Sequence, residues 1–113
     1  MTSIRFITTE DTLSIRSEVL RDGKLPPLEC RFSGDDEEES FHLGYFENED
    51  LVCIASFHLR GLADFSGKGY QLRGMATLPG YRGKGYGNKL INFVVVYLRG
   101  QKVNYLWCKP RKV

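Results

Sequence analysis

The C-terminal half of this 113-residue chain lacks acidic residues: no aspartate or glutamate follows Asp64. All fourteen acidic residues lie at or before Asp64, against six basic ones, so residues 1–64 carry a formal charge of −8. The ten lysines and arginines that follow give the second half a charge of +10. A segment with charges of one sign attracts an anionic partner, which could be a nucleotide, a nucleic acid or the protein's own acidic half.

Two further absences restrict the class of protein. No apolar run approaches the length of a membrane span, and the N-terminal residues contain no signal-peptide core, so we expect neither membrane association nor export. The three cysteines, Cys30, Cys53 and Cys108, form no C-x-x-C pair, and the last two lie in strand-like apolar runs. We therefore expect reduced, mostly buried thiols, no metal site and a cytoplasmic protein. The length predicts a single domain over residues 1–113.

The N-terminal third is predicted to form one strand and one helix. Residues 3–7 alternate as a strand does, and residues 13–20 show helical spacing, with Asp11 or Thr12 as the expected helix cap. Two glycines and two prolines in residues 21–34 predict an extended loop. The acidic block at residues 35–39 is predicted to be a solvated loop, because its like charges repel unless a cation or basic partner is near.

The rest of the chain predicts three antiparallel strands, a helix and a last strand. Residues 40–47 and 51–59 form a hairpin, and residues 70–78 add a further strand. The valines at positions 94–96 could indicate another strand, but the periodic run of about twelve residues around them favours a helix. A helical crossover then places a last strand at residues 103–108 parallel to residues 70–78. The expected apolar face of the helix comprises Tyr86, Leu90, Phe93, Val94, Tyr97 and Leu98.

A glycine-rich cationic turn, Arg82-Gly-Lys-Gly-Tyr-Gly87, precedes this helix. Such a turn offers several backbone N–H groups and the positive end of the helix dipole to an anion. A P-loop is excluded, because Lys84 is followed by glycine and position 78 is leucine. The dinucleotide fingerprint is also excluded, because the glycines run G-x-G-x-G and no acidic residue follows.

The pattern that does match is R-x-x-G-x-G, and the whole segment from Met75 to Gly87, MATLPGYRGKGYG, resembles the acetyl-CoA-binding motif of the GCN5-related N-acetyltransferases (the GNAT family). The order of elements resembles that family over nearly the whole chain. The resemblance implies a mixed α/β fold, with a mostly antiparallel central sheet and a parallel pair around the cofactor-binding helix. The residues implied to bind acetyl-CoA are Met75, Ala76, Thr77, Arg82, Gly83, Lys84, Gly85, Tyr86, Gly87 and Asn88.

The resemblance also implies a reaction, in which an amine attacks the acetyl-CoA thioester directly. In the family the acid is often a tyrosine on a helix after the fifth strand, a region that begins with an Asn-Ala-Arg-like segment. Lys109 stands at that asparagine position, and no tyrosine of this chain matches the acid. We therefore expect a domain that lacks that helix and the last two strands and turns over weakly or not at all. It should either pair with a second copy through its C-terminal strand or be a shortened form of a longer enzyme.

No catalytic residue is assigned from the sequence, and the acceptor amine is not identified. His42 and His58 are expected to be partly solvated or hydrogen-bonded strand histidines, and Cys108 a core residue. The other candidates are Glu47 and Glu49, expected to be solvated at a turn, and Gln71 and Arg73, which could face the acceptor pocket.

Two other functions stay open at this point. One is a non-catalytic acyl-CoA-binding domain. The other, which is less favoured, is a basic nucleic-acid-binding module that stacks bases on aromatic rings. The rings available for stacking are Tyr70, Tyr81, Tyr86, Tyr105 and Trp107.

Overall fold

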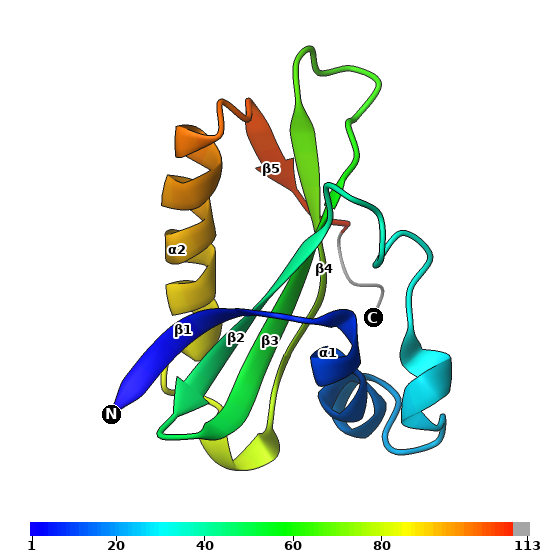
Figure 1. The fold of residues 1–113 in the computed structure, drawn as a ribbon, viewed down its shortest axis with the longest axis vertical. Coiled ribbons are helices and arrows are strands. Elements are labelled where there is room, and N and C mark those ends of the chain that lie inside the picture. The colour runs from blue at the N-terminus through cyan, green and yellow to red at the C-terminus, as the bar shows by residue number, and fades with distance from the viewer. Residues whose placement is uncertain (110–113) are drawn as a thin grey trace.

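The computed structural model describes residues 1–109, which form one five-stranded sheet between two layers of helix (Figure 1). The strands are β1 (Thr2–Ile7), β2 (Phe41–Glu47), β3 (Asp50–Leu59), β4 (Gly69–Thr77) and β5 (Tyr105–Trp107). The helices are α1 (Thr9–Ile15), the π-helical turn η1 (Arg16–Leu20), the 3₁₀ turns η2 (Pro27–Cys30) and η3 (Pro79–Tyr81), and α2 (Tyr86–Gly100).

The sheet has the expected mixed topology. Its strands lie in the order β1-β2-β3-β4-β5, with antiparallel pairing up to β4 and parallel pairing between β4 and β5. The parallel pairing is short: β5 contacts β4 only at Gly69, Tyr70 and Gln71, while β4 continues to Thr77. Beyond Gln71, therefore, no strand of the described chain pairs with this edge of β4, because β5 ends at Trp107.

A bulge in β4 lies next to this unpaired edge of the strand. Ile54 of β3 pairs with Ala76 of β4, and Ser56 pairs with Arg73. An interval of two residues in β3 is therefore matched by three in β4. Gly74 lies within the extra length and has a left-handed φ of +61°. A Cβ on Gly74 would lie 2.7 Å from the Phe32 ring, so glycine is needed here for both conformation and space.

The helix α2 covers one face of the sheet, and α1 with η1 and η2 covers the other (Figure 1). Four residues of the predicted α2 face are buried against β2, β3 and β4: Tyr86, Leu90, Val94 and Leu98. Phe93 and Tyr97 lie at the margin of this face and contact the ring of Phe6. The helix prediction is thus confirmed, and α2 begins at Tyr86, the first residue of the predicted apolar face.

The first helix begins earlier than predicted, and neither expected cap is correct. Thr8 is the N-cap: its hydroxyl accepts from the Asp11 N–H at 3.2 Å, and Asp11 Oδ2 accepts from the Thr8 N–H at 3.0 Å. This reciprocal capping box satisfies two helix-end donors at once, which a cap at Asp11 or Thr12 would not do. The predicted loop at residues 21–34 also contains a helical turn, η2, which Pro27 opens.

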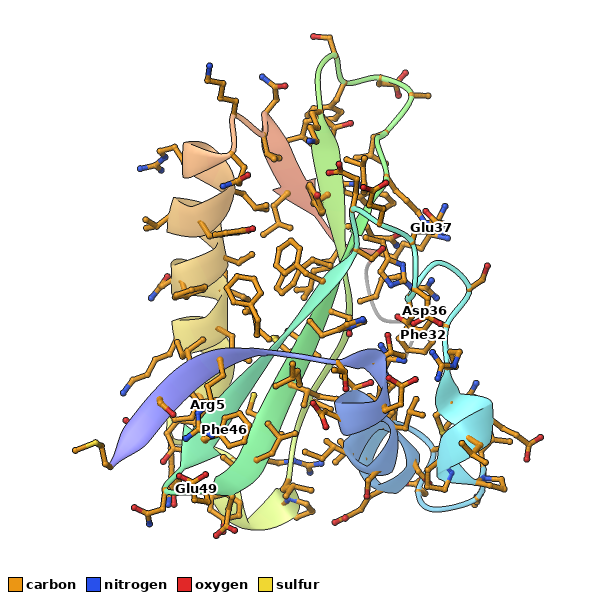
Figure 2. The ribbon with its side chains drawn as sticks, in the orientation of Figure 1. Arg5, Phe32, Asp36, Glu37, Phe46 and Glu49 are labelled. Carbon is orange, nitrogen blue, oxygen red and sulfur yellow. The ribbon has the colours of Figure 1, made fainter. Side chains whose placement is uncertain are left out.

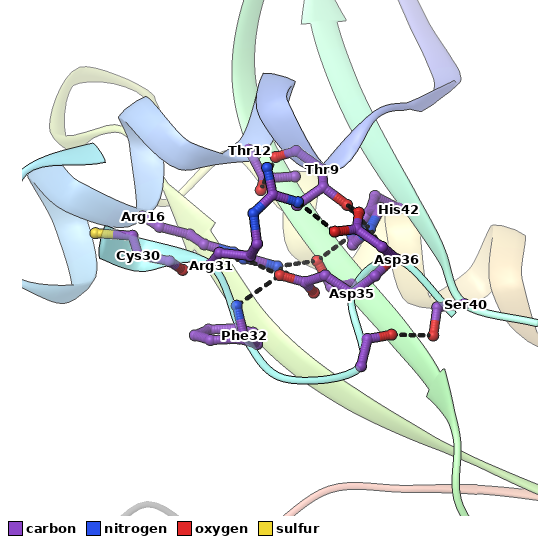
Figure 3. A network of polar contacts seen from close by, with 12 residues as sticks. Thr9, Thr12, Arg16, Cys30, Arg31, Phe32, Asp35, Asp36, Ser40 and His42 are labelled. Carbon is purple, nitrogen blue, oxygen red and sulfur yellow. Dashed lines mark hydrogen bonds and ion pairs between the residues drawn. The ribbon is translucent and has the colours of Figure 1, made fainter. Parts of the chain in front are cut away.

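The acidic block is not a uniformly solvated loop, because Asp35 is buried (Figure 3). Its carboxylate accepts from the Arg16 guanidinium at 2.7 and 3.1 Å and from the Phe32 N–H at 2.7 Å. Neighbouring acidic residues find basic partners too: Asp36 pairs with Arg31, Glu37 with Arg60, and Glu39 with Lys68. Figure 2 shows Phe32, Asp36 and Glu37 on the side of the sheet opposite α2.

The cysteine prediction is correct at two positions and wrong at one. Cys30 and Cys53 are buried free thiols, and burial raises the pKa of Cys53. Cys108 is exposed, because β5 ends at Trp107 and the chain leaves the sheet there. Among the residues described, no helix is long and apolar enough to cross a membrane.

Candidate functional site

The turn from Arg82 to Gly87 joins η3 to the N-terminus of α2. Gly83 and Gly85 adopt left-handed φ values of +81° and +80°, which a residue with a Cβ rarely adopts. Gly87 has a different role: it lies in the first turn of α2, where a Cβ would meet the Met75 sulfur at 3.4 Å. Gly83 and Gly85 therefore shape the turn, whereas at Gly87 a Cβ would make an ordinary contact with the Met75 side chain.

The same turn presents a row of free backbone donors. The first N–H with a partner at this helix end is that of Lys89, which donates to the Gly85 carbonyl at 3.1 Å. Within residues 1–109, no backbone or side-chain acceptor makes a hydrogen bond of good geometry with the N–H groups of residues 82–88. Together with the positive end of the α2 dipole, these groups form an anion cradle.

The side chains around the cradle are held by the rest of the fold. Arg82 Nε donates to the Thr77 carbonyl at 3.2 Å, and Lys84 Nζ lies 3.5 Å from Glu47. The Tyr86 ring is buried and stacks on Tyr45 with centroids 4.1 Å apart, while its hydroxyl donates to the Glu47 carboxylate. Tyr86 can therefore offer a ligand only its backbone N–H.

The contact between Tyr86 and Glu47 changes both groups. The hydrogen bond to Glu47 raises the pKa of Tyr86 to about 12, and the bond from Tyr86 lowers the pKa of Glu47. The expectation that Glu47 is simply solvated at a turn is wrong, because it links the cradle to β2. Glu49 is exposed at the hairpin turn, as expected, and pairs with Arg5 at 3.4 Å (Figure 2).

Two cavities follow β4 away from the cradle. A groove of about 420 Å³ is lined by Val19, Asp22, Met75, Ala76, Thr77 and Arg82. It contains four of the residues predicted to bind the cofactor, at the edge of β4 that lacks a strand partner in the described chain. This edge is available to pair with an extended ligand backbone, such as the amide-containing arm of coenzyme A.

The second cavity, which we call the splay cleft, has a volume of about 700 Å³. Met75 borders both cavities, so the groove and the cleft are neighbours at this residue. Gln71 and Arg73 line the cleft, as the sequence indicated, and Cys108 lines it as well, contrary to expectation. The remaining lining residues are Leu20, Phe32, Arg60, Leu72, Gly74, Met75 and Lys109.

The two histidines belong to a buried network rather than to the cleft. His58 Nε2 lies 2.9 Å from Asp35 Oδ1, and His42 contacts the Ser56 hydroxyl at 2.7 Å and the Thr9 hydroxyl at 3.0 Å. Both side chains are at most 4% exposed, so the hydrogen-bonded alternative of the prediction holds and the solvated one does not. Burial lowers the pKa of His42, which favours the neutral imidazole.

Asp35 is the centre of this network (Figure 3). Burial alone would raise the pKa of Asp35, but the hydrogen bonds from His58 and Arg16 offset that effect and lower it. The network therefore contains a buried ion pair that joins η1 to the loop before β2. No group of three or more potential metal ligands occurs among the residues that the structure describes.

Sequence reasoning missed Phe32 and Arg60 as cleft residues. Phe32 lies in a loop with no periodic pattern, and Arg60 follows the last residue of β3. No local signal in the sequence assigns either residue to the cleft, because tertiary packing brings them there from distant segments. In the family, further site residues follow the fifth strand. In this chain that segment includes Pro110 to Val113, which lie outside the described residues.

A short parallel strand pair, with an anion cradle at the N-terminus of the crossover helix, defines a mixed α/β fold whose groove has the shape and charge to suit an elongated anionic ligand. Comparison with known proteins gives the class. The model of the Acetyltransferase (GNAT) family matches residues 7–112. This chain belongs to that family, and it is an enzyme of the acetyltransferase class.

The relatives agree with this assignment. An uncharacterized N-acetyltransferase of Bacillus subtilis (strain 168), YitI, is 39% identical over 114 residues, which cover 98% of this chain and 74% of that protein. A ribosomal-protein-alanine N-acetyltransferase of Brucella melitensis biovar Abortus 2308 shares the fold with a TM-score of 0.75 at 14% identity, covering 100% of this chain and 82% of that one. A predicted acetyltransferase with acetyl-CoA from Clostridium acetobutylicum gives a TM-score of 0.76 at 18% identity. The match covers 99% of this chain and 82% of that one.

Proposed function

We propose that the protein is an acetyl-CoA-dependent N-acetyltransferase that moves the acetyl group to an amine, with residues 1–113 acting as one domain. The observation that carries this proposal is the cradle at residues 82–88, whose backbone N–H groups have no acceptor in the described chain. The similar chain from Clostridium acetobutylicum, solved with acetyl-CoA, supports the choice of ligand. Buried, unpaired Cys30 and Cys53 suit the reducing cytoplasm, where we place the protein.

The proposed substrate path uses all ten predicted cofactor-binding residues. The pyrophosphate of acetyl-CoA binds at the cradle, where Arg82 and Lys84 add positive charge. The pantetheine arm lies along Met75–Thr77 and pairs with the free edge of β4. In this pose the thioester lies near Met75, where the splay cleft adjoins the groove.

In the proposed reaction, the amine nitrogen forms a bond with the acetyl carbonyl carbon, and the bond from that carbon to sulfur breaks. The ammonium proton must leave before attack, and the departing thiolate must gain a proton. A backbone N–H near Thr77 would polarise the thioester carbonyl. The described lining of the cleft holds no carboxylate or imidazole, so solvent is the proposed proton acceptor and turnover lacks the roughly 10²–10⁴-fold gain of a positioned base.

Thermal unfolding with added ligand tests the proposal directly. Acetyl-CoA and CoA should both raise the melting temperature, because a ligand that binds only the native state stabilises by about 2.7 kcal/mol at 100 times its Kd. Adenosine 3′,5′-bisphosphate, which lacks pantetheine, should stabilise less. A folded protein whose melting temperature is unchanged by millimolar CoA would count against the whole assignment.

A non-catalytic acyl-CoA-binding role is the second candidate, since the described cleft contains no evident acid or base. CoA binding without any release of free thiol from acetyl-CoA in the presence of amines would support it. The nucleic-acid-binding alternative is weaker than the sequence suggested. Tyr70 and Tyr86 are buried, so these two rings cannot stack on bases, and the Trp107 indole is held by a 2.8 Å hydrogen bond to the Arg60 carbonyl.

We also propose that two copies of the chain associate at β5. This strand lies at the edge of the sheet, and no strand of the described residues pairs with its outer side. An apolar hollow of about 350 Å³ lies beside it, with Val95, Leu98, Val103 and Leu106 in its wall. A free edge beside apolar surface suits pairing with a second β5.

A further inference from the structure

The splay cleft has an unusual charge, which limits the amines that it can accept. Three of its lining residues are cationic, namely Arg60, Arg73 and Lys109, and none of its described lining residues is acidic. Arg60 is partly neutralised, because its guanidinium lies 3.9 Å from Glu37. Within residues 1–109, neither Arg73 nor Lys109 lies within 4 Å of a carboxylate oxygen.

Arg73 is held in place by Phe32. The Arg73 guanidinium carbon lies 4.6 Å from the centre of the Phe32 ring, and that of Arg16 lies 3.8 Å from it. The charge of Arg16 is neutralised by Asp35, whereas Arg73 has no such partner in the described chain. The Phe32 ring therefore contacts both a paired guanidinium and an unpaired one. The ring itself is fixed by the 2.7 Å bond from the Phe32 N–H to Asp35 and by its packing on Gly74. Such a preorganised guanidinium binds an anion with little ordering cost.

The anion on this arginine is not the phosphate of coenzyme A in the proposed pose. The phosphates have their own cradle at residues 82–88, and the groove from Arg82 to Met75 separates that cradle from Gln71 and Arg73. The cationic residues of the cleft therefore lie beyond the thioester, on the acceptor side.

We propose that the acceptor is an amine that also carries an anionic group, a carboxylate or a phosphate, and that Arg73 binds this group. The inference rests on the proposed acetyl-transfer function. Guanidinium groups recognise both anions through paired hydrogen bonds. The same positive charge disfavours the protonated form of the acceptor amine and thus assists attack in a cleft without a described base. It also disfavours polycationic acceptors through repulsion.

Matched amine pairs test the proposal with the full chain. Alanine is compared with alaninamide, and phosphoethanolamine with ethanolamine, with spermidine as the polycation, all at equal concentrations of unprotonated amine and with CoA release as the readout. The anion-bearing member of at least one pair should have the higher kcat/KM, and the pair that responds identifies carboxylate or phosphate.

Substitution of the arginine provides the second arm. Arg73→Gln should lower kcat/KM for the anion-bearing amine by about ten- to a hundredfold, mainly through KM, and should change the neutral partner little. Arg5→Gln removes the same charge from β1, away from the cleft, and should change neither. CoA-induced stabilisation should be the same in all three proteins.

Several results would overturn the inference. A preference for neutral or polycationic amines would contradict it, as would the acetylation of none of the five amines. Equal effects of Arg73→Gln on both members of a pair would also contradict it. Loss of CoA-induced stabilisation in Arg73→Gln would assign the arginine to the cofactor instead. A wild-type chain that does not bind CoA would overturn the proposed function itself, and this inference with it.

Discussion

The buried pair of Arg16 and Asp35 connects the site to the core at the scale of single residues. Both side chains are at most 1% exposed, and Asp35 also receives hydrogen bonds from His58 and from the Phe32 backbone. Two buried nitrogens, Arg16 Nε and His58 Nδ1, have no partner among the described residues. The network therefore stabilises the fold only while every charge in it is matched. Because Phe32 depends on Asp35, the network also positions a wall of the cleft.

Substitution of Arg16 should show how much the stability of the fold depends on this ion pair. Arg16→Met would leave the Asp35 carboxylate buried without its main countercharge, so we expect the free energy of unfolding to fall by about 3–5 kcal/mol. Urea denaturation followed by circular dichroism measures this change. Arg31→Met is the matched control, since Arg31 makes ion pairs with Glu10 and Asp36 at the surface, and it should cost far less. Equal costs for the two substitutions would show that the buried pair is not special.

At the scale of helices and strands, the correct predictions are those that depend on local sequence patterns. The hairpin of β2 and β3 and the helix α2 follow from periodicity and turn residues, and the parallel placement of β5 follows from the crossover. The capping box at Thr8 and Asp11 was also readable, three residues apart, but it precedes the apolar run on which the prediction focused. The burial of Asp35 was not readable, because its partner Arg16 lies nineteen residues earlier and only tertiary packing joins them.

The cradle allows a prediction about two glycines in one segment. Gly80 and Gly85 both have open space around the position of a Cβ, with no atom within 4 Å, but only Gly85 has a left-handed φ. Gly85→Val should turn the N–H groups of the cradle away and abolish CoA-induced stabilisation, at a folding cost of about 1–3 kcal/mol. Gly80→Val should retain CoA binding. Calorimetric titration with CoA compares them, and full affinity in Gly85→Val would mean that the cradle lies elsewhere.

At the scale of the whole molecule, the two oppositely charged halves neutralise each other only in part. Two of the ion pairs in the described residues join the halves, Lys68 with Glu39 and Lys84 with Glu47. Most of the acidic block instead uses arginines of its own half, namely Arg16, Arg31 and Arg60. Arg73 of β4 and Arg82 of the cradle make no ion pair within the described residues, so their charges remain available to an anionic ligand. The absence of acidic residues after Asp64 is what a surface for the proposed ligands, coenzyme A and an anion-bearing amine, would require.

The proposed association through β5 gives a last prediction at this scale. Val95 and Val96 are neighbours on α2, with 38% and 68% of their surfaces exposed, but only Val95 lines the hollow beside β5. If two copies pair there, Val95→Glu buries a charge in the interface and should shift the protein to monomers. Val96→Glu introduces the same charge one residue further on and should leave the dimer intact. Sedimentation velocity over a hundredfold range of protein concentration distinguishes the species, and a wild-type chain that stays monomeric at the highest concentration would refute the proposed dimer.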